Sequence, residues 1–158
     1  MINVTVNGIA QALDVPPDRM LLRALREELG LVSVREACGV GMCGSCTVLI
    51  DGEPMSACLL LAGQVEGREV TTVDALAANG RLSTLQQAFV EKTGFQCSFC
   101  TPGFLLTTTA LLAESPAASE DEIREFLEGQ VCRCGSYVKI LAAVQHAQQL
   151  LRSETQSP

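Results

Sequence analysis

Tryptophan is missing from this sequence, tyrosine and histidine occur once each, and basic residues are few. Eleven Lys and Arg stand against eighteen Asp and Glu, which gives a formal net charge of −7. Because a nucleic-acid-binding surface is basic, this balance argues against nucleic acid as a partner. The single histidine, His146, lies late in the last expected helix and away from every cysteine, so we do not expect it to bind a metal.

Long apolar segments are missing as well. The most apolar one, residues 104–113, is ten residues long and contains three threonines, which is too short to span a bilayer. The N-terminus lacks the basic segment followed by an apolar run that marks a secretory signal peptide. We therefore predict no membrane span and a cytoplasmic location. No arrangement of a catalytic acid, base or nucleophile is predicted.

Cysteine, in contrast, is abundant: the chain has eight, with four in each half. An even number allows disulfides. However, a chain of 158 residues can bury enough surface to fold without them, and no export signal is present. Two separate groups of four thiols favour metal ligation over cross-linking.

The first group follows the ligand spacing of a plant-type 2Fe–2S cluster, C-x4-C-x2-C with a fourth cysteine downstream. Its members are Cys38, Cys43, Cys46 and Cys58. Glycines between the first three thiols allow the backbone to curl with its N–H groups toward sulfur. A strand over residues 47–50, an Asp51-Gly52 turn and a returning strand then bring Cys58 beside Cys46. Pro54 predicts that the returning strand lies at a sheet edge or follows a longer loop.

The second group consists of Cys97, Cys100, Cys132 and Cys134. We expect each pair to precede the start of a helix, with Pro102 in the first turn of one helix and Ser136 as the N-cap of the other. Helix N-termini favour the anionic form of cysteine, so two such ends suit a negatively charged cluster. The spacing leaves a zinc site open as an alternative, since CxxC pairs also bind zinc.

The remaining pattern divides the chain into two domains, residues 1–78 and residues 79–158. The first is expected to contain strands over residues 2–6, 9–15 and 70–73, a helix over residues 21–29 ended by Gly30, and a short helix over residues 74–79. The second is expected to contain only helices: from Ser83 to Gly94, over residues 104–114, from Ser119 to Gly129, and from Ser136 onward. The fold class predicted is α+β, a ferredoxin-like module followed by a bundle of four helices.

Three stretches resemble a known family: residues 38–58, residues 94–103 and the Cys132-Arg133-Cys134 motif. They are similar to the iron–sulfur subunit of molybdenum hydroxylases, the xanthine oxidase family, over nearly the whole chain. The resemblance implies a β-grasp, plant-type ferredoxin domain followed by an all-α four-helix-bundle domain, each holding one 2Fe–2S cluster. It also implies that Gln96 and Cys134 contact the molybdopterin of a large partner subunit.

The sequence departs from the common pattern of that family at a few positions, none of which removes a ligand. Ser98 replaces a usual glycine, Gln130 replaces a frequent asparagine, Gly135-Ser136 replaces Thr-Gly, and Arg35-Glu36-Ala37 replaces a lysine–any–glycine lead-in. The Cys-Arg-Cys-Gly-Ser-Tyr form looks closer to the enzymes for aromatic N-heterocycles and aldehydes than to carbon monoxide dehydrogenase.

The predicted function is therefore that of an electron-transfer subunit. It relays electrons from the molybdopterin site, through the bundle cluster and the N-terminal cluster, to FAD in a medium subunit or to another acceptor. The resemblance implies a dimer of heterotrimers. Two alternatives stay open: a free ferredoxin-type carrier whose helical half is stabilised by zinc, and a disulfide-bonded binding module.

Overall fold

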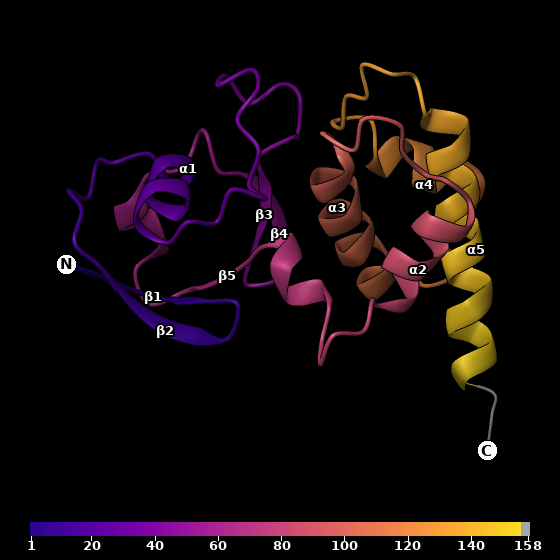
Figure 1. Cartoon of the computed structure of the whole chain (residues 1–158), viewed down its shortest axis with the longest axis horizontal. Helices are drawn as coiled ribbons and strands as arrows, with labels where there is room; N and C mark the ends of the chain where they lie inside the picture. The colour runs from indigo at the N-terminus through magenta and orange to yellow at the C-terminus, as the bar shows by residue number, and fades with distance from the viewer. Residues whose placement is uncertain (156–158) are drawn as a thin grey trace.

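The computed structural model describes residues 1–155, and it places the strands in one half of the molecule and most helices in the other. In Figure 1 the sheet and α1 lie at the N-terminal side, and helices α2 to α5 lie together at the C-terminal side. The α+β class predicted from the sequence is confirmed. None of the helices within residues 1–155 is both long enough and apolar enough to cross a membrane.

A five-stranded mixed sheet forms the N-terminal half. Its strands are β1 (Ile2–Val6), β2 (Ile9–Leu13), β3 (Thr47–Ile50), β4 (Glu53–Ser56) and β5 (Glu69–Thr71). The spatial order is β2-β1-β5-β3-β4, with β1 and β5 parallel and the other neighbours antiparallel. Strand β4, which contains Pro54, lies at an edge, as the proline predicts.

The turns of both hairpins, β1–β2 and β3–β4, lie at the two-residue turn sequences. Asn7 and Gly8 have φ values of 53° and 77°, and Asp51 and Gly52 have values of 51° and 91°. Positive φ at both central residues defines the tight turn whose twist matches the flanking strands. The β3–β4 register, Thr47 opposite Ser56, leads Cys46 and Cys58 out of neighbouring strands at the same end.

Two strands are shorter or shifted relative to the prediction. Strand β2 ends at Leu13 rather than at residue 15 because its partner β1 begins at Ile2, which pairs with Leu13. Strand β5 ends at Thr71 because the next amide, that of Thr72, donates to the side chain of Asn7 at 2.7 Å. The short helix expected over residues 74–79 is a 3-10 turn, Val73–Leu76.

One side of the sheet is covered by α1 (Leu21–Arg23) and the π-helical turn that continues it, Ala24–Glu28. Leu21, Leu22 and Leu25 are fully buried there, and Gly30 follows with a φ of 67°, as the predicted helix end requires. These side chains belong to one hydrophobic core, formed by residues between Ile2 and Val70.

The helical half has its own hydrophobic core, formed by residues between Leu85 and Ala147. Its helices are α2 (Thr84–Glu91), α3 (Thr101–Glu114), α4 (Glu120–Phe126) and α5 (Tyr137–Thr155). The capping boxes predicted at Ser83 and Ser119 are both present. The domain boundary after residue 78 stays a prediction, although it falls between the two cores.

Three helix limits differ from the sequence pattern. Helix α3 begins at Thr101 rather than at residue 104, with Pro102 in its first turn, and α4 ends at Phe126 rather than near Gly129. The end of α2 also differs in detail. The Thr93 amide donates to the Val90 carbonyl at 3.2 Å and the Gly94 amide to the Phe89 carbonyl at 2.8 Å, the two bonds of a Schellman motif.

The left-handed residue in that motif is Thr93, with a φ of 53°, and not Gly94. A β-branched side chain is strained in this conformation. Gly94 is instead required by close packing, because a Cβ there would lie 2.9 Å from Cδ1 of Phe89 and 3.2 Å from Cβ of Ala143.

We therefore expect Thr93→Gly to raise the free energy of unfolding by about 0.5–1 kcal/mol, the relief of strain less the added freedom of glycine in the unfolded chain. Gly94→Ala, one position further on, should lower it. Denaturant unfolding followed by far-UV circular dichroism measures both. A Thr93→Gly protein less stable than the parent would contradict the assignment.

Candidate metal centres

The first group of thiols lies on the loop between the α1 region and β3 and on the segment after β4. Cys46 and Cys58 are buried, Cys43 is half-buried and Cys38 is exposed. The thiols lie within hydrogen-bonding distance of one another in two pairs, Cys38 with Cys43 and Cys46 with Cys58. The prediction that the hairpin returns Cys58 to Cys46 is confirmed.

Backbone amides surround the exposed thiol of this group. The Val40 amide donates to Sγ of Cys38 at 3.5 Å. The amides of Val40 and Met42 lower the pKa of the Cys38 thiol to about 6. Burial, in contrast, raises the pKa of the Cys46 thiol to about 12. Cys38 thus already favours the thiolate form near neutral pH, whereas Cys46 needs a nearby cation to lose its proton.

The second group repeats this arrangement in the helical half. Cys100 directly precedes α3, and Cys134 stands three residues before α5, so both pairs lie at helix N-termini as predicted. Cys100 and Cys132 are buried, whereas Cys97 and Cys134 are exposed. The pairs within hydrogen-bonding distance are Cys97 with Cys134 and Cys100 with Cys132.

In the second group the two buried thiols have opposite shifts, because the pKa of Cys132 is lowered: burial would raise it, but the Ser136 amide and the neighbouring Cys100 thiol outweigh burial. Burial raises the pKa of the Cys100 thiol to about 12. The Phe99 amide lowers the pKa of the Cys97 thiol. In addition, the Ser136 amide donates to Sγ of Cys132 at 3.4 Å. Ser136 is the N-cap of α5 in the sense that its carbonyl accepts the amide of Ile140.

The donor set of each group fits a 2Fe–2S cluster. Such a cluster takes four cysteine thiolates, two on each iron, so the thiols should come in two pairs. A structural zinc ion needs its four ligands around one point. Within residues 1–155 no three His, Cys, Asp or Glu side chains converge on the position of a single ion. All eight cysteines are free thiols, and the assignment of them as cluster ligands stays a prediction.

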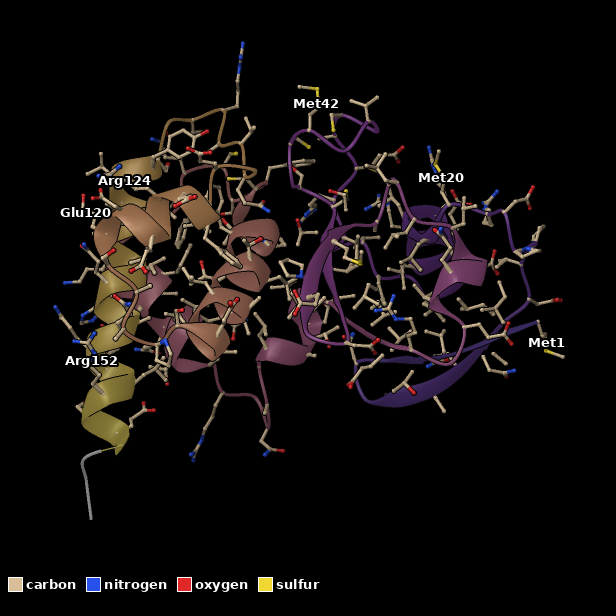
Figure 2. All side chains as sticks on the ribbon, turned by 180° about the vertical axis from the view of Figure 1, so that it is seen from behind. Met1, Met20, Met42, Glu120, Arg124 and Arg152 are labelled. Atoms are coloured by element: carbon tan, nitrogen blue, oxygen red, sulfur yellow. The ribbon has the colours of Figure 1, made fainter. Side chains whose placement is uncertain are left out.

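Gln96 and Cys134, the pair that the resemblance associates with the pterin, are neighbours on the surface. Nε2 of Gln96 donates to the carbonyl oxygen of Cys134 at 3.2 Å, and both residues are exposed. Both cysteine-bearing loops emerge at the same end of the molecule (Figure 1). Figure 2 shows Met42, 75% exposed, projecting at this end.

Sequence reasoning missed a support of the second group. The hydroxyl of Tyr137 accepts a hydrogen bond from the Cys132 amide at 2.8 Å. Its ring packs edge-on against Phe104, with ring centroids 6.2 Å apart at 73°. Helical spacing places Tyr137 on the same face of the last helix as Ile140 and Val144, but nothing in that spacing points to a role for its hydroxyl.

Ser98, which stands where the family usually has glycine, has a φ of 63°. Glycine adopts this conformation without strain, which is consistent with the glycine that the resemblance implies at this position. Ser98 lies in the turn between Cys97 and Cys100, and the turn keeps its shape with serine there.

Comparison with known proteins agrees with this geometry. The family profile of the 2Fe-2S iron-sulfur cluster binding domain matches residues 4–83, and that of the 2Fe-2S binding domain matches residues 72–145. The fold and the thiol geometry thus define an iron–sulfur protein. Relatives narrow this class further.

The nicotinate dehydrogenase small FeS subunit of Eubacterium barkeri is 44% identical over 146 residues, 92% of this chain and 93% of that one. A chain in the crystal structure of quinoline 2-oxidoreductase from Pseudomonas putida 86 superposes with a TM-score of 0.91 at 43% identity, covering 96% of this chain and 95% of that one. The aldehyde oxidoreductase of Desulfovibrio desulfuricans gives a TM-score of 0.93 at 39% identity, and the match covers 97% of this chain but 17% of that much longer one. The chain belongs to the iron–sulfur subunits of the molybdenum hydroxylases, the xanthine oxidase family.

Tyr137→Phe tests the support beneath Cys132. The variant keeps the ring contact with Phe104 but leaves the Cys132 amide without its acceptor, so we expect the free energy of unfolding to fall by about 1–2 kcal/mol. Denaturant unfolding of the iron-loaded chain measures this. Val138→Ala, next in the chain and 77% exposed, is the control and should change little. Equal stability of Tyr137→Phe and the parent would contradict the role.

Proposed function

We propose that this chain is the electron-transfer subunit of a molybdenum hydroxylase and holds two 2Fe–2S clusters. Cys38, Cys43, Cys46 and Cys58 would hold one, and Cys97, Cys100, Cys132 and Cys134 the other. The observation that carries the proposal is that the thiols of each group interact as two pairs, and that loops bearing both groups emerge at the same end of the molecule (Figure 1). Each cluster, when bound, takes up and gives back one electron.

The residues of the chain would control how readily that electron is accepted. Amide donors, those of Val40 and Ser136 among them, stabilise negative charge on sulfur. Burial of the inner thiols acts in the opposite direction, because charge is costly away from water. No side chain of this subunit is proposed as an acid, base or nucleophile.

Two partner subunits complete the proposal. The molybdopterin of a large subunit would lie against Gln96 and Cys134, which are adjacent and exposed. FAD in a medium subunit, or another acceptor, would receive electrons from the side of the first group. Electrons would thus cross the chain from the second group to the first, in a dimer of heterotrimers.

The substrate proposed for the whole enzyme is an aromatic N-heterocycle or an aldehyde. Support comes from the relatives, which are named for nicotinate, for quinoline and for aldehydes. Since the substrate would bind to the large subunit, no residue of this chain selects among these compounds.

The finer description of the fold belongs to the same proposal. Residues 1–78 would form a β-grasp ferredoxin domain and residues 79–158 a four-helix-bundle domain, of which residues 156–158 lie outside the described part. The separate hydrophobic cores support this division. A cytoplasmic location remains a prediction from the sequence.

Metal analysis tests the cluster count. The full chain, purified without oxygen together with the subunits that accompany it, should carry about four irons and four sulfides per copy from this subunit. Two iron-based signals should appear in its electron paramagnetic resonance spectrum after reduction. About two irons with one zinc per chain would contradict the proposal and favour the zinc-stabilised ferredoxin.

Single cysteine variants then assign the signals. Cys43→Ser should remove one of the two signals and leave the other, and Cys100→Ser should do the reverse. A serine variant outside both groups, Ala118→Ser in the helical half, is the control and should keep both. Loss of both signals in Cys43→Ser, with the helical content unchanged, would show that the two groups do not bind independently.

A further inference from the structure

A buried glutamine joins the two halves of the molecule. Nε2 of Gln130 donates to Oγ1 of Thr47 on β3 at 3.0 Å and to Oγ1 of Thr107 on α3 at 2.8 Å. The Thr47 hydroxyl in turn donates to the Gly44 carbonyl at 2.7 Å. Exposed fractions are 7% for Gln130, 5% for Thr47 and 4% for Thr107, so this polar chain is shielded from water between the two cores.

The backbones on either side of Gln130 approach each other closely. A Cβ at Gly103 would collide with the Gly44 carbonyl oxygen and with Oε1 of Gln130, and a Cβ at Gly44 would collide with the same amide group. Next to these contacts, the Val131 amide donates to the Cys43 carbonyl at 2.9 Å. Gln130 therefore fills a narrow space between two backbone segments rather than a surface groove.

Apart from Thr107, each residue in these contacts lies within three positions of a cysteine in one of the two groups. Gly44 stands between Cys43 and Cys46, and Thr47 follows Cys46. On the other side Gly103 follows Cys100, and Gln130 precedes Cys132 by two positions. A second contact crosses at the outer side, where the guanidinium of Arg35 lies 5.7 Å from the centre of the Phe99 ring.

We infer that Gln130 is a positioning residue that sets the separation and orientation of the two groups of thiols. The inference rests on the proposed function, because the separation matters only if both groups carry clusters. Apolar packing also joins the halves, because Val73 and Leu76 pack against the helical core and α3 lies beside β3. The contacts of Gln130 differ from this packing in that they lie next to the cysteines of both groups. Electron tunnelling between two centres slows as their separation grows, so a contact that holds this separation bears directly on the proposed relay.

Gln148 provides a matched control. It is also a buried glutamine, 6% exposed, and its Nε2 also makes two hydrogen bonds, to the carbonyls of Pro116 and Ala118 at 3.3 and 2.9 Å. Both partners belong to the helical half, so this residue does not cross between the domains. Methionine replaces either glutamine with nearly equal length and volume but without a donor.

The experiment compares Gln130→Met and Gln148→Met in the full iron-loaded chain. Amide hydrogen exchange at Val131 reports whether the halves separate locally, and we expect it to be about tenfold or more faster in Gln130→Met and unchanged in Gln148→Met. Electron paramagnetic resonance of the fully reduced protein reports the magnetic interaction between the two centres. The splitting that this interaction causes should become smaller or less well defined in Gln130→Met alone. The iron content and the separate signal of each centre should stay as in the parent.

The outcomes separate this inference from the proposed function. If the parent protein lacks two iron signals, the proposed function fails first. If the parent has both signals, and Gln130→Met leaves Val131 exchange and the interaction of the centres as they are, only the positioning role of Gln130 is overturned. Equal changes in both methionine variants would also overturn it, because they would reflect a general loss of stability.

Discussion

The hydrogen bond from the Val131 amide to the Cys43 carbonyl joins two loops that belong to different hydrophobic cores. The sheet with α1 forms one core and α2 to α5 form the other, against which Val73 and Leu76 of the N-terminal half also pack. Packing of α3 beside β3 and β4 brings the halves into contact. The relative placement of the thiol groups depends on this polar junction, where backbone meets backbone with no room for a side chain other than that of Gln130.

Both groups of thiols share one electrostatic design, although their folds are unrelated. An inner pair is buried, and burial raises the pKa of Cys46 and of Cys100 to about 12. An outer pair is more open to solvent, with Cys43 half-buried and Cys38, Cys97 and Cys134 exposed, and backbone amides lower the pKa of Cys38 and of Cys97. The loop supplies these amides through its turns, and the helical half supplies them through turns and helix N-termini. The outer thiols of each group are thus the more accessible ones, and the buried thiols anchor the group to a core.

The sequence predicted those features whose cause is local. Hairpin turns and helix caps depend on the conformational preferences of segments of about four residues. This is why the sequence predicted the turns at Asn7-Gly8 and Asp51-Gly52 and the caps at Ser83 and Ser119. Features that depend on distant partners were not predictable. The end of β5 is set by the side chain of Asn7, 65 positions away. Likewise, the Gln130 contacts require Thr47 and Thr107 to come together, and no periodicity in the sequence relates these residues.

The positions at which the sequence departs from the family pattern also involve contacts with residues far away in the sequence. Three of the positions that the sequence analysis gave as departures from the family pattern, Arg35, Ser98 and Gln130, lie at or next to the contact between the halves. Arg35 covers Phe99, the neighbour of Ser98. Glutamine is one methylene longer than the frequent asparagine, and it uses that length to reach Thr47 and Thr107 at once. A shorter amide would lose one of the two bonds unless the backbones moved closer, which the contact between Gly44 and Gly103 forbids. The length of the glutamine side chain at position 130 is therefore matched to the distance between the two halves, where the cysteine-bearing segments meet.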